Sequence, residues 1–170
     1  MFHFTDTQWK VIFKIPICSL RDVKTRYFQF KFLHRILGTN YLKSKMKIVD
    51  ESTCSLCGRM PQTLEHLFWN CQAVSSFILD MEQIFLGTQF SLSKEDFFFG
   101  YKFELFHPFN FLIFHLKHYI FRQANFNNVL KSSEFVYMFS FLLKVEKSIC
   151  IERFNKLVAS FANCKDLCRL

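Results

Sequence analysis

The chain has 170 residues, of which 51% are hydrophobic and 19% aromatic, and it contains only four glycines and three prolines. This composition excludes an intrinsically disordered chain and argues against a turn-rich β-sandwich. A chain of this length buries about 70% of its unfolded surface, which is enough for a core without disulfides. Its longest uncharged run, residues 66–79, contains polar side chains and is shorter than the ~18 apolar residues of a membrane-spanning helix, so no membrane partner is expected.

The positive charge of the chain is concentrated in its first third. Lys and Arg number 22 against 14 Asp and Glu, and ten of the basic residues lie between Lys10 and Lys47, where Asp22 is the only acidic residue. A localised positive field suits a polyanion, with nucleic acid as the first candidate. A solvated helical surface without a partner is the alternative, and charge alone favours neither. Asp6 and Lys14 interrupt the stretch that a signal peptide would keep apolar, so secretion is not indicated.

Hydrophobic periodicity and capping residues predict three helices before the first cysteine pair. The first covers residues 6–14, with Thr5 or Asp6 as its cap and Pro16 as its end. The second covers residues 20–37, between Ser19 as N-cap and Gly38 just past its end. The third is a short helix over residues 41–48, capped by Thr39 or Asn40. On the second helix one apolar face is predicted to consist of Val23, Tyr27, Phe30, Leu33 and Leu37, and Arg21, Lys24, Lys31 and Arg35 lie beside it with Phe28 among them.

The second half of the chain is also predicted to be helical. Apolar residues at helical spacing predict a helix over residues 74–85, up to Gly87, and Ser93 with Asp96 resembles a capping box. The Phe-rich run 97–103 fits either a helix or a strand. Residues 108–122 and 134–161 are predicted helices, separated by residues 125–128. The fold class is therefore mainly α, with residues 1–90 as a basic, metal-binding part and residues 91–170 as a helical tail packed on it in one domain.

Four residues have the spacing of a zinc site. Cys54, Cys57, His66 and Cys71 follow the pattern C-x2-C-x8-H-x4-C, and three thiolates with one imidazole provide the four donors that tetrahedral Zn²⁺ requires. Thr63 is expected to cap a helix that has His66 in its first turn. Cys71 follows five residues later, about 140° around an ideal helix, so the helix must end or distort there. Because all four positions are filled, a structural Zn²⁺ is predicted, and Gly58 eases the turn after the cysteine pair.

The remaining cysteines and histidines give weaker signals. Cys18 and Cys150 stand alone, and Cys164 with Cys168 has no further ligand nearby. A redox role for Cys54 and Cys57 is the competing interpretation of their C-x-x-C spacing, but His66 and Cys71 at ligand spacing favour metal. His34 is expected to be a packed, hydrogen-bonded histidine rather than a ligand.

The order of these motifs resembles a known family. The runs WKVIFKIP, RYFQFKFLHRILGTNYLKSKMKI and CSLCGRMPQTLEHLFWNC are similar to the zinc-binding C-terminal region of the reverse transcriptases of non-LTR (LINE-type) retrotransposons. The similarity covers about residues 9–86, and residues 117–123 resemble the family's helical tail less closely. Phe77 and Ile78 depart from a Phe-Trp pair that is common in the family. The matching residues are Phe28, Gln29, Phe30, Lys31, His34, Arg35, Ile36, Leu37, Thr39, Asn40, Leu42, Met46, Lys47, Ile48, Thr63, Leu67, Phe68 and Trp69, besides the four zinc ligands.

The resemblance implies a non-enzymatic part of a retroelement protein. The family's polymerase binds its catalytic magnesium ions through an Asp-Asp pair, and this chain has no such pair. The expected partners are template RNA, target DNA and a reverse transcriptase core, and the implied location is nuclear and cytoplasmic. The leading hypothesis is nucleic-acid binding; a protein-interaction module that docks onto a polymerase is the alternative. The expected phosphate contacts are Lys24, Lys31, Arg35, Lys43, Lys45 and Lys47, whereas Arg26 lies nearer the apolar face.

Overall fold

The computed structural model describes residues 3–85, 92–102 and 107–161. Within these ranges every regular element is helical, apart from one antiparallel bridge between Thr53 and Pro61, so the mainly α fold class is confirmed. Gly87, Cys164 and Cys168 lie outside the described residues. The elements are α1 (Asp6–Ser19), α2 (Val23–Leu33), α3 (Asn40–Lys45), the π-helical turn η1 (His66–Asn70), α4 (Gln72–Phe85), α5 (Lys94–Phe99), α6 (Pro108–Asn125), α7 (Ser132–Ile149) and α8 (Ile151–Ser160).

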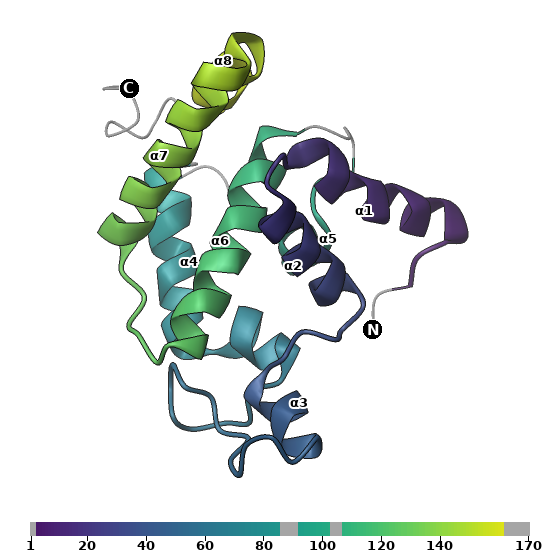
Figure 1. Ribbon diagram of the computed structural model, residues 1–170, viewed down its shortest axis with the longest axis vertical. Coiled ribbons are helices and arrows are strands. Elements are labelled where there is room, and N and C mark those ends of the chain that lie inside the picture. The colour runs from purple at the N-terminus through teal and green to yellow at the C-terminus, as the bar shows by residue number, and fades with distance from the viewer. Residues whose placement is uncertain (1–2, 86–91, 103–106, 162–170) are drawn as a thin grey trace.

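Helix α6 is the centre of the fold. It is buried along most of its length and contacts α1, α2, η1, α7 and α8 (Figure 1). Helices α1 and α2 cover one side of α6, and α4 and α7 lie on the other (Figure 1). Helix α3 and the cysteine-containing loops gather at one end of the molecule, next to the C-terminal end of α6. Side chains from both halves of the chain share one hydrophobic core.

Helix-capping residues are confirmed at three of the predicted starts. Thr5 accepts a hydrogen bond from the backbone N–H of Gln8 in a capping box, and Thr39 accepts one from Leu42. Ser93 accepts a hydrogen bond from the N–H of Asp96 at 3.0 Å. Each cap satisfies an N–H group that the first turn of a helix leaves without an intrahelical partner.

The predicted end of α1 at Pro16 is wrong. The helix continues through this proline to Ser19. Its buried face, formed by Ile12, Ile15, Pro16 and Ser19, packs towards α2 and α6. This burial outweighs the cost of about 3 kcal/mol that a proline imposes inside a helix.

The predicted boundaries and buried face of α2 are also wrong. The helix begins after Asp22, whose carboxylate accepts hydrogen bonds from the N–H groups of Lys24 and Thr25, and it ends at Leu33 rather than Leu37. The predicted apolar face is largely exposed, since Val23, Tyr27 and Phe30 all face solvent, and the buried residues are Thr25, Phe28, Gln29 and Phe32. The two buried polar side chains have distant partners: the Thr25 hydroxyl lies 3.0 Å from Nδ1 of His118, and the Gln29 amide donates to the carbonyl of Phe114 at 3.3 Å.

Two predictions in the second half need correction or completion. The first residues of the Phe-rich run lie in helix α5, which ends at Phe99. Gly100 follows with a φ of 80°, a conformation that suits glycine. The long helix predicted over residues 134–161 is interrupted at Cys150, whose φ of −154° is extended, and this break gives α7 and α8. The break allows α8 to pack against α7 and α6. Arg153 on α8 then forms an ion pair with the buried Glu146 of α7 at 2.9 Å.

Lys117 is a fully buried lysine among the aromatic rings of the core. Its side chain is 0% exposed, and Nζ donates a hydrogen bond to the carbonyl of Phe98 at 3.2 Å. Nζ also lies 4.2 Å from the ring centroid of Phe32 and 4.8 Å from that of Phe114. Burial lowers the pKa of Lys117 well below its ordinary value.

Candidate metal centre

The four predicted ligands come together in space. The donor atoms of Cys54, Cys57, His66 and Cys71 all lie within 4.8 Å of one another, and the group could hold a metal ion. The Sγ atoms of Cys54 and Cys71 are 4.0 Å apart, and Sγ of Cys57 is 3.3 Å from Nε2 of His66. A disulfide would require about 2.05 Å between sulfurs, whereas Zn–S bonds of about 2.3 Å place the thiolates of a tetrahedron about 3.8 Å apart. The spacing therefore fits metal ligands and not a disulfide.

A tight turn presents the first two cysteines. The N–H of Cys54 donates to the carbonyl of Met60 at 2.8 Å, and the N–H of Gly58 donates to the carbonyl of Cys54 at 2.8 Å. Gly58 has a φ of 65°, and a Cβ there would meet no atom within 4 Å, so its conformation rather than space favours glycine. The predicted role of Gly58 is confirmed.

A π-helical turn presents the other two ligands. Thr63 accepts a hydrogen bond from the N–H of His66 at 3.1 Å, which confirms the predicted cap and places His66 in the first turn. The N–H of Cys71 then donates to the carbonyl of His66, five residues back, at 2.8 Å. This wider turn places His66 and Cys71 on the same side, which an α-helix would not do. The predicted distortion near Cys71 is confirmed, with η1 as its form.

Cys71 also stands at the start of α4. Its carbonyl accepts the N–H of Ser75 at 2.8 Å, as an N-cap residue does. The hydrogen bond with Cys54 and burial raise the pKa of Cys71, while the N–H groups of Val74 and Ala73 lower it. The hydrogen bond with Cys71 lowers the pKa of Cys54 to about 4. A thiolate is thus favoured on Cys54, and a bound cation would favour one on Cys71 as well, beside the positive end of the α4 dipole.

A buried glutamine connects the metal-ligand loop to α3. The side-chain amide of Gln62 donates to the hydroxyl of Ser55 at 2.9 Å and lies 4.0 Å from Sγ of Cys54. Its carbonyl oxygen accepts the N–H of Asn40 at 2.9 Å, and the Asn40 amide donates to the carbonyl of Thr53 at 2.9 Å. The first turn of α3 is therefore held by the loop that carries two of the ligands. No pattern in the sequence indicates this role for Gln62.

The same loop is joined to the end of α6. The hydroxyl of Ser55 donates to the carbonyl of Ala124 at 2.7 Å. Nζ of Lys43 on α3 donates to Oδ1 of Asn125 at 3.1 Å. The ligand loop, α3 and the C-terminal end of α6 thus form one connected unit, visible at one end of the molecule in Figure 1.

The predicted phosphate contacts divide into two groups. Lys43 is engaged with Asn125, whereas Lys24, Lys31, Arg35, Lys45 and Lys47 form no ion pair within the described part of the chain. Lys24, Arg35, Lys45 and Lys47 are exposed, and Lys31 is partly exposed. Two other basic residues of the segment are committed to the fold: Arg21 faces Glu146 at 3.5 Å, and Nε of Arg26 donates to the carbonyl of Leu20 at 2.6 Å.

His34 packs on aromatic rings just after α2. It is exposed at the end of α2, and its ring stacks on Phe13 with centroids 5.1 Å apart. It also contacts Phe30 at 4.3 Å and lies outside the metal-ligand group, so the expectation of a packed histidine rather than a ligand is confirmed. Cys18 and Cys150 are free thiols outside the metal-ligand group, in agreement with the prediction.

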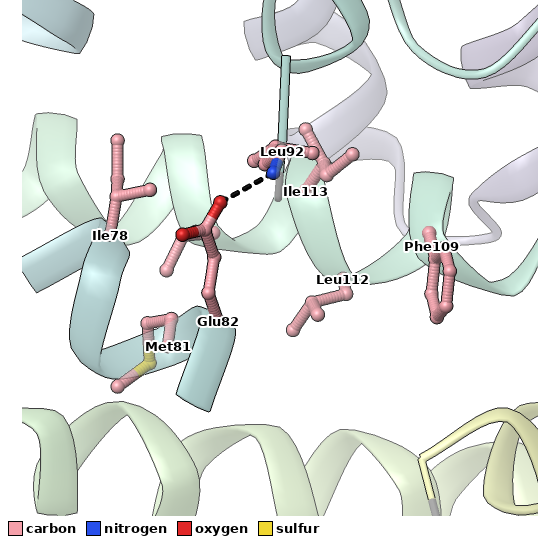
Figure 2. Close-up of a pocket in the computed structure, with 8 residues that line it drawn as sticks. Ile78, Met81, Glu82, Leu92, Phe109, Leu112 and Ile113 are labelled. Carbon is pink, nitrogen blue, oxygen red and sulfur yellow. Dashed lines mark hydrogen bonds between the residues drawn. The ribbon is translucent and has the colours of Figure 1, made fainter. Parts of the chain in front are cut away.

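The apolar cavity between α4 and α6 is not a ligand site. Figure 2 shows the side chains around it, with one oxygen of Glu82 accepting the N–H of Leu92 at 2.5 Å. Its space of about 10 Å³ is at the limit for a single water molecule. Its lining is otherwise apolar: Ile78, Met81, Leu92, Phe109, Leu112, Ile113 and Leu116. Glu82 is the one polar residue of this lining, so the cavity does not bring together the polar side chains of a catalytic site.

Comparison with protein-family models, with curated proteins and with solved structures finds no match. Among the described residues, the Cys and His group is the one cluster of three or more His, Cys, Asp or Glu side chains that could hold a metal ion. No helix in the described ranges is long and apolar enough to cross a membrane. The site and its surroundings define a helical domain in which a group of side chains that could hold a metal ion lies beside a basic segment.

Proposed function

We propose that this chain is a non-catalytic, zinc-stabilised domain that binds nucleic acid, equivalent to the C-terminal zinc-binding region of non-LTR retrotransposon reverse transcriptases. One observation carries the proposal: Gln62 joins the metal-ligand loop at Cys54 to the start of α3 at Asn40. Metal binding therefore fixes the position of α3, and with it that of Lys45 and Lys47. The sequence motifs described above support the choice of family.

Zinc is the metal that the donor set favours. Thiolates are soft ligands that Mg²⁺ and Ca²⁺ disfavour, and three of them with one imidazole form a common structural zinc site. All four positions are protein side chains, so none is left for a substrate or an activated water. The ion would stabilise the fold, since free energy of binding to such a site is also free energy of folding.

Five basic side chains supply the phosphate contacts in this proposal. Lys24, Lys31, Arg35, Lys45 and Lys47 are available because none of them forms an ion pair in the described structure. Each phosphate that they neutralise releases condensed counterions, which gives affinity that falls with salt. The resemblance suggests template RNA and target DNA as ligands, a reverse transcriptase core as a neighbour, and a ribonucleoprotein that is both cytoplasmic and nuclear.

A matched pair of charge variants tests the proposal. In the first, Lys24, Lys31, Lys45 and Lys47 are changed to Gln; in the second, the exposed Lys131, Lys144, Lys147 and Lys156 are changed to Gln, so that the net charge changes equally. We expect the first variant to lose affinity for RNA and to show a shallower dependence on salt, by about 0.7 per phosphate contact on a single strand. Equal losses from both variants would mean that net charge, and not this segment, attracts the ligand.

The protein-interaction alternative is supported by one observation. Tyr137 and Phe141 on α7 are 79% and 61% exposed, and large exposed rings often mark protein contacts. A reverse transcriptase core could cover this face without involving α1–α3. Retained binding to such a core by a variant that no longer binds RNA would separate the two functions.

A further inference from the structure

Aromatic rings from α1 and α2 form a continuous row on the protein surface. Trp9 stacks on Phe13 with centroids 5.7 Å apart, and Phe13 stacks on His34 at 5.1 Å. His34 contacts Phe30 at 4.3 Å, and Phe30 lies parallel to Tyr27 at 6.5 Å with 5° between the ring planes. We call these five rings the surface aromatic row.

Four of the five rings of the aromatic row are open to solvent, and Trp9 is half-buried. Tyr27 is 58% exposed and Phe30 49%, and Phe13 and His34 are also exposed. Tyr27 and Phe30 do not contribute to the core, because the opposite face of α2 packs on α6 and η1. Exposing apolar rings to water is unfavourable, and a contiguous exposed group of them is typical of a surface that binds a partner.

One cation contacts the aromatic row, and three more lie on the same two helices or directly after them. Lys31 places Nζ 4.3 Å from the ring centroid of Tyr27, and Lys10 and Lys14 are exposed on α1 next in sequence to Trp9 and Phe13. Arg35 follows His34 directly and is exposed. None of these cations forms an ion pair among the described residues. The row thus carries a cation at Tyr27 and belongs to the most basic segment of the chain, a combination that complements bases and phosphates together.

We propose that the surface aromatic row is a stacking platform for the unpaired bases of a single-stranded nucleic acid. This inference rests on the proposed function and names the strand type that the domain selects. In a duplex the flat faces of the bases are already stacked, whereas unpaired bases can lie on Tyr27, Phe30 and Phe13 while the flanking cations contact the backbone. A protein partner is less well matched, because the cores of protein interfaces are depleted of charged residues such as lysine.

The test compares two double variants of the full-length, metal-loaded chain. In the first, Tyr27 and Phe30 are both changed to Leu, which keeps apolar surface and removes the rings. In the second, the exposed Tyr137 and Phe141 of α7 are changed to Leu as a matched control. Each protein is titrated with a fluorescein-labelled 12-nucleotide RNA single strand and with a 12-base-pair RNA duplex.

We expect the Y27L/F30L variant to bind the single strand about tenfold or more weakly, with an unchanged salt slope because no phosphate contact is lost. Its affinity for the duplex should change less than about twofold, and the control variant should bind both probes as the parent does. Unchanged single-strand affinity, or equal loss for both probes, would overturn the stacking platform while leaving the proposed function in place. Failure of the parent itself to bind either probe would overturn both.

Retained folding of each variant is checked by helicity and by metal content. Tyr27 is the most exposed ring of the aromatic row, so Tyr27→Leu alone should not affect folding. This single substitution provides a second variant. A graded loss of single-strand affinity from the single to the double variant supports the platform. The stacking platform would be contradicted if Tyr27→Leu bound the single strand like the parent and the Y27L/F30L variant lost helicity.

Discussion

Arg35 and Lys47 occupy the same position in two copies of one structural motif. Each is the left-handed residue just past a helix, with φ values of 56° and 57°. The N–H of Ile36 donates to the carbonyl of Lys31 at 3.0 Å after α2, and the N–H of Ile48 donates to that of Lys43 at 2.9 Å after α3. Glycine is the usual residue at this position of a Schellman motif. Basic side chains here carry a conformational cost that function can explain.

Replacing these residues by glycine should separate stability from binding. We predict that Arg35→Gly and Lys47→Gly each raise the free energy of unfolding by about 0.5–1 kcal/mol, because glycine adopts this conformation without a Cβ penalty. Each should also weaken RNA binding and reduce its salt slope. Urea unfolding and anisotropy titrations measure the two effects.

Asn127 provides the control for these substitutions. It has a φ of 53° in the same motif after α6 and carries no charge. Asn127→Gly should leave RNA affinity unchanged. Loss of stability in the arginine and lysine variants would mean that these side chains support the fold, and a loss of binding in the asparagine variant would point to altered helix ends instead.

Metal removal should disorder one end of the molecule. We predict that Cys71→Ser, or treatment of the parent with a chelator, removes a stoichiometric zinc ion, lowers helicity and weakens RNA binding, since the ligand loop holds α3. Cys150→Ser, a free thiol outside the group, should retain both metal and binding. Atomic absorption and circular dichroism provide the measurements. A chelated protein that keeps its helicity and affinity would contradict a structural metal.

The connection through Gln62 can be tested without touching a ligand. Gln62→Ala leaves the N–H of Asn40 and the hydroxyl of Ser55 without this partner. We predict a loss of about 1–3 kcal/mol in the free energy of unfolding and weaker RNA binding, with zinc stoichiometry unchanged. Hydrogen exchange should show reduced protection confined to α3 and the ligand loop. Uniformly reduced protection would indicate a global role instead.

The buried Lys117 makes stability depend on pH in the alkaline range. Its folded-state pKa is lowered by burial, while an unfolded lysine has a pKa of about 10.4. Between these two values the unfolded state binds the extra proton, so the free energy of unfolding should rise with pH, by about 1.4 kcal/mol per pH unit at most. Lys117→Met should be more stable than the parent at pH 7 and lose this dependence.

The exposed Lys144 of α7 is the matched control for this prediction. Lys144→Met should change neither the free energy of unfolding at pH 7 nor its slope between pH 7 and 9.5, as measured in urea. An Lys117→Met variant with the same alkaline slope as the parent would show that other groups produce it.

Local signals explain which parts of the structure the sequence could predict. The four metal ligands, the cap at Thr63 and the distortion before Cys71 all follow from spacing within a short segment. The caps Thr5, Thr39 and Ser93 are equally local. Side-chain chemistry within a few residues decides each of these features, so a single sequence contains the necessary information.

The errors arose where distant contacts decide the outcome. Hydrophobicity alone places Tyr27 and Phe30 inside, yet α2 buries Thr25 and Gln29, whose partners His118 and Phe114 lie on α6. Hydrophobic periodicity takes no account of such partners, and it therefore assigns the wrong face of α2 to the core. The passage of α1 through Pro16 and the break at Cys150 likewise depend on packing between helices, for which the sequence has no local marker.

The most direct test of the whole account is the salt dependence of RNA binding by the metal-loaded chain. Anisotropy titrations of a single-stranded RNA at several salt concentrations give the slope of log affinity against log salt. Contacts from Lys24, Lys31, Arg35, Lys45 and Lys47 predict a slope of roughly −3 to −4 for a single strand. A folded chain that holds its zinc but shows no salt-dependent affinity for RNA or DNA would contradict nucleic-acid binding.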